Sequence, residues 1–266
     1  MRFFLELSYR GTAYNGWQRQ PASPTVQQAL EEALSTLLRE DVTIVGAGRT
    51  DTGVHAAYYV AHFDTAHDLV AGDENRPPRR GVSVYMGTPA AEFCYHLNAL
   101  LPDDIAVSAV RRVRDDAHAR FDARRREYRY HILPRKDPFR RDTTWQYYVP
   151  LDLEAMNRAA AMLLEHDDFT TFSKLHAANK TTICRVVKSQ WENVNGELIY
   201  AVASDRFLRN MVRSLVGTLV DVGRGKITPE RFGEILRAHD RSLVSGSAPA
   251  QGLFLSDVDY PDEIYL

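Results

Sequence analysis

Residues 42–63 read VTIVGAGRTDTGVHAAYYVAHF and place a glycine-rich turn between two apolar stretches. Both stretches, at residues 42–45 and 58–63, are rich in β-branched and aromatic residues, which favours strands. A third stretch of this kind lies at residues 3–9. After Pro24, apolar residues recur at helical spacing and predict an amphipathic helix. The apolar positions of this helix are Val26, Leu30, Ala33, Leu34, Leu37 and Leu38.

The second half of the chain repeats this order of signals loosely. Residues 128–133 favour a strand, and two further strands are expected at residues 185–194 and 198–203. The dipeptide Asn195-Gly196 between the last two predicts a tight hairpin, because both central residues of a type I′ turn need a positive φ. A helix between these strands is predicted by apolar residues at Leu153, Met156, Ala159, Ala160, Leu163 and Leu164.

Strand–helix–strand–strand order in both halves indicates an α+β protein with two units. Pro102 interrupts the pattern, and we place the boundary there, which gives an N-terminal domain at residues 1–106 and a C-terminal domain at residues 107–266. Residues 73–81 are polar and rich in Pro and Arg, and we expect a mobile loop there.

Composition excludes several classes of protein. The 266 residues are 44% hydrophobic and 26% charged, which is typical of a soluble globular protein. The two cysteines, Cys94 and Cys184, form no Cys-x-x-Cys pair, so we expect neither a disulfide framework nor a cysteine-based zinc site, and a reducing compartment. At the start of the chain, Glu6 follows too few apolar residues for the core of a signal peptide, so we expect none. The sequence contains no run of about eighteen apolar residues, so we expect no membrane span.

Positive charge is concentrated in one part of the chain. The formal net charge is −2, yet residues 111–141 hold eleven Arg and one Lys against five acids, a local excess of +7. Arginine suits bidentate phosphate contacts and stacking on bases. The segment either meets nucleic acid or is a solvated charge run that acids elsewhere balance in space, and composition leaves both open.

The glycine-rich turn at residues 46–56 admits several interpretations. A dinucleotide-binding loop would need a glycine where Asp51 stands, and no Gly-Lys-Ser/Thr of a phosphate-binding loop follows. The tripeptide Asp51-Thr52-Gly53 occurs in aspartic proteases, but these need two carboxylates that share a proton, and Arg49 would oppose sharing. Two interpretations remain open: Asp51 is an activated nucleophile or base, or it closes an Asx-turn between strands.

Several motifs together resemble one known family. Residues 48–56, GRTDTGVHA, closely resemble the catalytic motif of the tRNA pseudouridine synthase A family, the TruA type. The other motifs occur in the family's order and extend the resemblance over nearly the whole chain. They are YRGT at residues 9–12, GWQRQ at 16–20, HARF at 118–121, YRY at 128–130, FLRNMVR at 207–213 with Val216-Gly217, and APAQGLFL at 248–255.

The resemblance implies an α+β fold of two related ferredoxin-like (RRM-like) halves. These would form a continuous, mainly antiparallel sheet with helices on one side and a central cleft. It also implies isomerisation of uridine to pseudouridine in the tRNA anticodon arm, at positions thirty-eight to forty. No cofactor and no metal are implied, and the expected partners are tRNA and, in a cytoplasmic homodimer, a second copy of the chain.

The resemblance assigns roles to five residues. Asp51 would be the catalytic carboxylate and Arg213 its catalytic partner. Tyr128 would act in catalysis and stack on the uracil, Arg49 would bind the RNA, and Leu253 would support the base.

Some alternatives stay open. Tyr130, on the same strand face, is a rival to Tyr128, and His55 and His118 are expected to be structural or to contact RNA. In a helix spanning residues 206–216, Arg209 and Arg213 would lie at i,i+4 on the polar face. The rival functions are a non-catalytic RNA-binding protein of the same fold and a pseudouridine synthase that acts on another RNA. Several members of one arginine cluster are expected to meet tRNA phosphates: Arg111, Arg112, Arg114, Arg124, Arg125, Arg126, Arg140 and Arg141.

Overall fold

The structure is a computed structural model, which describes residues 1–70, 88–173 and 181–266. The loop expected at residues 73–81 lies outside these ranges. The chain divides into two compact units, Met1–Arg124 with Val258–Leu266, and Arg125–Asp257. Both units combine helices with mainly antiparallel strands, so the predicted α+β class is confirmed.

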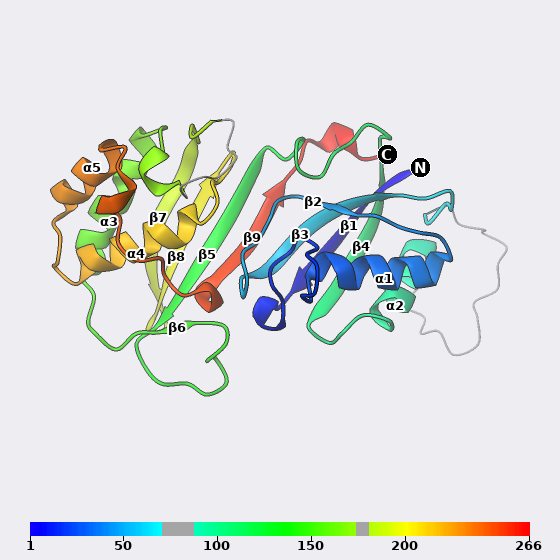
Figure 1. Ribbon diagram of the computed structural model, residues 1–266, viewed down its shortest axis with the longest axis horizontal. Coiled ribbons are helices and arrows are strands. Elements are labelled where there is room, and N and C mark those ends of the chain that lie inside the picture. Colours follow the sequence, from blue (N-terminus) through cyan, green and yellow to red (C-terminus); the bar gives the residue numbers. More distant parts are fainter. Residues whose placement is uncertain (71–87, 174–180) are drawn as a thin grey trace. The chain divides into compact units, whose positions relative to one another are not determined.

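The first unit is built around the central strand β1 (Figure 1). Its strand order is β4-β1-β3 with antiparallel pairing, and the short β2 pairs with β3. Its elements are β1 (Arg2–Tyr9), α1 (Val26–Leu38), β2 (Val45–Gly46), β3 (His55–Asp64), α2 (Pro89–Asn98) and β4 (Ile105–Val113). Helix α1 buries Leu30 and Leu34 completely, as its apolar spacing predicts.

The predicted domain boundary after residue 106 falls inside β4. This strand pairs with β1 along its whole length, from Tyr9 opposite Ile105 to Arg2 opposite Val113. The first unit therefore extends to Arg124.

The strand expected at residues 42–45 is wrong except at its last residue. Only Val45–Gly46 is a strand, because side chains of α1 satisfy the backbone that precedes it. The N–H of Val42 donates to Ser35 Oγ at 2.9 Å, and the N–H of Ile44 donates to Glu31 Oε1 at 3.2 Å. These residues pair with a helix instead of a neighbouring strand.

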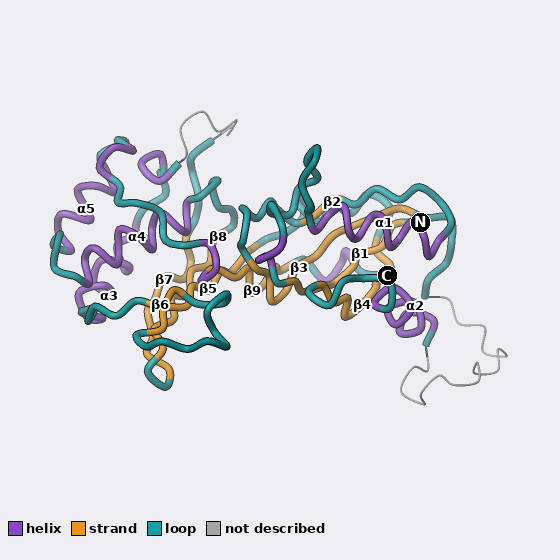
Figure 2. The backbone as a smooth tube through the Cα atoms, turned by 60° about the horizontal axis from the view of Figure 1, so that its bottom comes forward, coloured by secondary structure: helices purple, strands orange, loops and turns teal. Residues whose placement is uncertain are grey.

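The second unit places β5 next to β8 and β8 next to β7, with antiparallel pairing. Strand β9 adjoins β5 on the other side, and β6 pairs with β5 in parallel. Helices α3, α4 and α5 pack against one another (Figure 2). The elements are β5 (Arg125–Leu133), β6 (Trp145–Gln146), α3 (Leu153–Ala161), β7 (Val186–Val194), β8 (Glu197–Ser204), α4 (Met211–Gly223), α5 (Pro229–Arg237) and β9 (Leu253–Asp259), whose last two residues belong to the first unit.

Two sequence signals in this unit had different outcomes. The hairpin at Asn195-Gly196 is confirmed, with φ of 54° and 82°. The helix predicted over residues 206–216 begins only at Met211, because Asn210 has a left-handed φ of 63°. Arg209 therefore lies before the helix, and the expected placement of Arg209 and Arg213 at i,i+4 of one helix is wrong.

Helix α4 approaches a loop so closely that one of its positions must lack a side chain. A Cβ on Gly217 would overlap the backbone carbonyl of Gly246, and backbone cannot rotate away as a flexible side chain can. A side chain on Gly246 itself would meet no atom within 4 Å.

We expect Gly217→Ala to destabilise the protein by about 1–3 kcal/mol, the usual range for overpacking. The loss should appear although alanine is about 1 kcal/mol better than glycine inside a helix. Urea unfolding would measure it, with Gly246→Ala as the matched control that changes the free energy of unfolding by less than about 0.5 kcal/mol. A stabilised Gly217→Ala protein would contradict the close approach.

Candidate active site

Asp51 lies in the loop between β2 and β3, residues 47–54, which we call the Asp51 loop. Its last four residues form a turn in which the Val54 N–H donates to Asp51 O at 3.1 Å, and Gly53 has a φ of 75°. The Asp51 side chain is half-buried.

Two glycines of the YRGT and GWQRQ motifs lie directly against this loop. A Cβ on Gly11 would overlap Val54 O, and a Cβ on Gly16 would overlap Thr50 O. Gly16 also has a φ of 84°, a conformation that other residues rarely adopt. These two motifs and the GRTDTGVHA motif are therefore parts of one packed structure.

Hydrogen bonds fix the same contact. The N–H of Gly53 donates to Tyr14 O at 3.3 Å, and the N–H of Trp17 donates to Thr50 O at 3.3 Å. The hydroxyls of Tyr9 and Thr50 lie 2.8 Å apart in the interior. The backbone on both sides of Asp51 is therefore held by the segment that follows β1.

Both histidines of the motifs have structural contacts. His55 is fully buried, and its Nδ1 accepts a hydrogen bond from the Gly11 N–H at 2.9 Å. His118 Nδ1 accepts from the backbone N–H groups of Arg120 and Phe121 at 3.1 and 3.3 Å, and burial lowers the pKa of His118. The structural alternative is thus supported for both, and burial removes His55 from any surface that RNA could reach.

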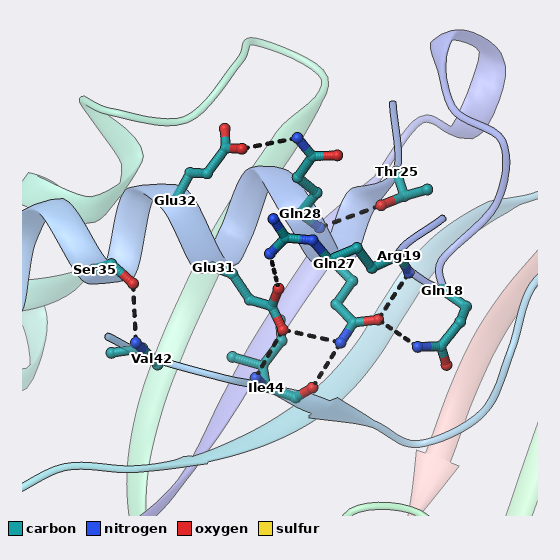
Figure 3. A network of polar contacts seen from close by, with 10 residues as sticks. All are labelled: Gln18, Arg19, Thr25, Gln27, Gln28, Glu31, Glu32, Ser35, Val42 and Ile44. Atoms are coloured by element: carbon teal, nitrogen blue, oxygen red, sulfur yellow. Dashed lines mark hydrogen bonds and ion pairs between the residues drawn. The ribbon is translucent and has the colours of Figure 1, made fainter. Parts of the chain in front are cut away.

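The exposed side chain of Arg49 is attached to a polar network on α1. Its Nε donates to Gln18 Oε1 at 3.2 Å, and Gln18 Nε2 donates to Gln27 Oε1 at 2.9 Å. Figure 3 shows how Gln27 connects the Gln18 segment with Glu31 and with the backbone of Ile44.

Glu31 is the acceptor at the centre of this network. It is buried and accepts hydrogen bonds from Arg19 Nη1, Gln27 Nε2 and the N–H of Ile44, at 2.9, 2.9 and 3.2 Å (Figure 3). Sequence reasoning missed Gln27 and Glu31, although two polar residues at i,i+4 within the apolar stripe of a helix are a signal of a buried polar contact.

In the second unit, Arg213 joins the start of α4 to the APAQGLFL motif. Its Nε donates to Ala248 O at 2.7 Å, and the N–H of Ala248 donates back to Arg213 O at 2.9 Å. The hydroxyl of Tyr130 donates to the next carbonyl, Pro249 O, at 2.8 Å. Arg213 and Tyr130 therefore hold the segment that leads into β9.

Accessibility differs among Tyr128, its rival Tyr130 and Leu253, the other predicted site residue of this unit. Tyr128 is half-buried, with its ring edge-on to Phe207 at 5.1 Å between centroids. Tyr130 is fully buried, burial raises the pKa of its hydroxyl, and its ring fills the space beside Gly252. Tyr128 is therefore the more accessible of the two rivals. Leu253 is buried at the first position of β9, as a core residue would be.

Many arginines of the basic segment are paired within the protein. Four of their acidic partners come from outside residues 111–141, which supports the alternative of a charge run balanced in space. The pairs are Arg111–Glu6, Arg112–Asp115, Arg114–Asp116, Arg124–Glu263, Arg125–Asp257 and Arg140–Glu197. In the described parts of the chain, Arg135 and Lys136 are exposed and pair with no carboxylate.

Neither a metal cluster nor a membrane-spanning helix occurs among the described residues. Residues 1–70, 88–173 and 181–266 contain no group of three or more His, Cys, Asp or Glu side chains that could hold a metal ion. Across the same ranges, no helix combines the length and the apolar character needed to cross a membrane.

The sequence that carries the Asp51 loop and Arg213 is similar to known proteins. The sequence model of a family described as tRNA pseudouridine synthase matches residues 7–122 and 159–261. Since these matches cover more than half of the chain, the chain belongs to the tRNA pseudouridine synthase family, a family of isomerases. Asp51 and Arg213 lie within the matched ranges, whereas Tyr128 lies between them.

Curated relatives specify the type. The chain is 46% identical to the tRNA pseudouridine synthase A of Bacteroides thetaiotaomicron, over 99% of this chain and 92% of that protein. It is 46% identical to the protein of the same name from Porphyromonas gingivalis, over 100% and 99% of the two chains. A more distant relative of the same name, from Thermoanaerobacter sp. strain X514, is 39% identical over 96% and 98%.

We expect Glu31→Ala to lower the free energy of unfolding by about 1–3 kcal/mol. The substitution removes the acceptor of the Ile44 N–H and of one of the two hydrogen bonds that Gln27 Nε2 donates in the interior. Chemical unfolding would measure the loss. Glu32→Ala is the matched control on the same helix, because the Glu32 side chain is exposed and, among the described residues, accepts only an exposed hydrogen bond from Gln28 Nε2, at 2.8 Å. Equal stability of the two variants would refute the importance of the network.

Proposed function

We propose that this chain converts uridine to pseudouridine in the anticodon arm of tRNA, at positions thirty-eight to forty. The observation that carries the proposal is the full-length similarity to proteins named tRNA pseudouridine synthase A, together with the placement of Asp51. This carboxylate lies in a loop whose backbone is hydrogen-bonded on both sides of it, at Thr50 and Gly53. A reacting group raises the rate most when its position is fixed before the substrate binds.

The isomerisation of uridine to pseudouridine requires one ionised carboxylate. In this isomerisation the bond from uracil N1 to the sugar breaks, a bond from C5 to the same sugar carbon forms, the C5 proton leaves, and N1 gains one. Asp51 would attack the sugar or the base, or take the proton. Atoms and electrons balance within the substrate, so we propose a reaction without a cofactor. Arg213, Tyr128, Arg49 and Leu253 keep the roles that the family resemblance gives them.

The partners belong to the same proposal. The substrate would be tRNA, the enzyme would act in the cytoplasm as a homodimer, and the two units would be the two related ferredoxin-like halves. A stacked uridine has to leave its helix before it can react, at a cost of a few kcal/mol. The half-buried ring of Tyr128 offers a surface on which the flipped base could stack, worth about 1–3 kcal/mol.

Asp51→Asn should abolish turnover and leave tRNA binding and the fold intact, because an amide of the same shape is neither a nucleophile nor a base. Purified protein would be incubated with unmodified tRNA transcripts, and pseudouridine would be mapped at each site. Asp41→Asn, at an exposed position of the same unit, is the matched control and should keep full activity. Asp51→Asn turnover above about a tenth of wild type, a barrier change of only about 1.4 kcal/mol, would refute the role. Modification outside the anticodon arm would refute the site assignment.

For phosphate binding, we expect the unpaired cations to matter more than the paired ones. Arg135→Ala with Lys136→Ala should make the slope of log affinity against log salt shallower, by about 0.7–0.9 for each phosphate that the variant no longer binds. The choice of uridine should not change, since phosphate contacts position the RNA without reading bases. Affinity for tRNA across a salt series would measure the slope.

Arg124→Ala with Arg125→Ala is the comparison for this experiment. Both arginines already have acidic partners, Glu263 and Asp257, at 2.9 and 2.6 Å, so this double variant should change the slope less. The opposite order of the two effects would assign RNA binding to the paired arginines.

A further inference from the structure

We infer that Tyr59 positions the Asp51 loop for catalysis. Tyr59 lies on β3, and none of its surface is exposed. Its hydroxyl donates to Gly48 O and lies 3.4 Å from the Gly48 N–H, which donates to it. One hydroxyl thus satisfies both backbone groups of Gly48, three residues before Asp51.

The Tyr59 hydroxyl replaces the backbone hydrogen bonds of the β2–β3 ladder at the point where this ladder ends. The strands pair Val45 with His62 and Gly46 with Ala61, and the next bond runs from the Ala47 N–H to Val60 O at 2.8 Å. The next pair along this ladder would bring together Gly48 and Tyr59. There the side chain of Tyr59 binds Gly48, so the loop leaves the sheet while its backbone remains fixed.

Two further aromatic side chains hold the Tyr59 ring. Trp17 stacks on it with 4.1 Å between ring centroids and an interplanar angle of 27°, and Tyr9 meets its edge at 5.6 Å. Trp17 and Tyr9 are 2% and 4% exposed. Gly46 provides the space for this cluster, because a Cβ there would overlap the Tyr59 hydroxyl and lie 2.6 Å from Trp17 Cε2.

The aromatic cluster of Tyr9, Trp17 and Tyr59 also contacts Thr50, the residue that follows Arg49. Tyr9 Oη lies 2.8 Å from Thr50 Oγ1, and the N–H of Trp17 donates to Thr50 O at 3.3 Å. Gly48 and Thr50 are therefore both held by one buried aromatic cluster. Arg49 lies between these two points, and Asp51 follows the second directly. Since Tyr59 is fully buried, the role we assign to it is that of a positioning residue, which acts through the backbone of Gly48.

This inference rests on the proposed catalytic role of Asp51, and Tyr59→Phe tests it. The variant keeps the ring and its stacking but frees Gly48. A reacting group displaced by about 1 Å can lose about a hundredfold in rate, so the single-turnover rate at saturating tRNA should fall at least about tenfold. Affinity for tRNA should stay within about twofold, because Tyr59 is not on the surface.

Tyr200→Phe is the matched control. Tyr200 is also fully buried, stacks on a tryptophan (Trp191) at an angle of 27°, and has its hydroxyl 2.8 Å from Ser189 Oγ. It lies on β8 in the other unit, and its variant loses a comparable buried hydroxyl. Turnover of Tyr200→Phe should equal that of wild type at a temperature where both variants are folded.

The rates of these variants distinguish failure of the Tyr59 inference from failure of the proposed function. A rate for Tyr59→Phe equal to that of Tyr200→Phe overturns the inference, and so does a loss that appears only in tRNA affinity. Gly46→Ala provides a second route, since it crowds the Tyr59 hydroxyl and should also lower the rate. An inactive Asp51→Asn with a fully active Tyr59→Phe would refute only the role of Tyr59, whereas an active Asp51→Asn would refute the proposed function itself.

Discussion

The backbone of the Asp51 loop lies so close to the segment after β1 that neither Gly11 nor Gly16 can carry a side chain. Much of the packing around Asp51 depends on this contact. It allows Tyr14 O and the Trp17 N–H to reach the loop, and it brings the ring of Trp17 against β3. A single methyl group at either glycine would separate the two segments and remove these bonds together.

The second unit is organised by the same kind of constraint. Gly217 lets a loop approach α4, and Gly252 leaves room for the ring of Tyr130. Arg213 and Tyr130 then bind the two consecutive carbonyls of Ala248 and Pro249. The motifs along the sequence are therefore pairs of surfaces in contact, each pair inside one unit. This explains why the sequence shows motifs that are far apart in the chain but contact each other in the structure.

Local chemistry made much of the fold predictable. Alternation, helical spacing and the Asn195-Gly196 dipeptide found β1, α1, β8 and the hairpin because those signals act within a few residues. Prediction failed where distant groups decided the outcome. Side chains of α1 replaced strand pairing near Ile44, and acids far along the chain paired with the basic segment. The Asp51 motif was visible in the sequence. Tyr59 was not, because an aromatic residue in a strand ordinarily indicates only a core position.

The attachment of the pre-β2 segment to α1 affects how the protein opens. The Ile44 N–H is bonded to Glu31 and the Gly48 N–H to Tyr59, so neither amide has a strand partner. Their exchange with deuterium would therefore report separation of the helix or rotation of an aromatic ring. Strand fraying would not release them. Glu31 also binds Gln27, which leads through Gln18 to Arg49, so we expect opening of α1 to release Arg49 as well.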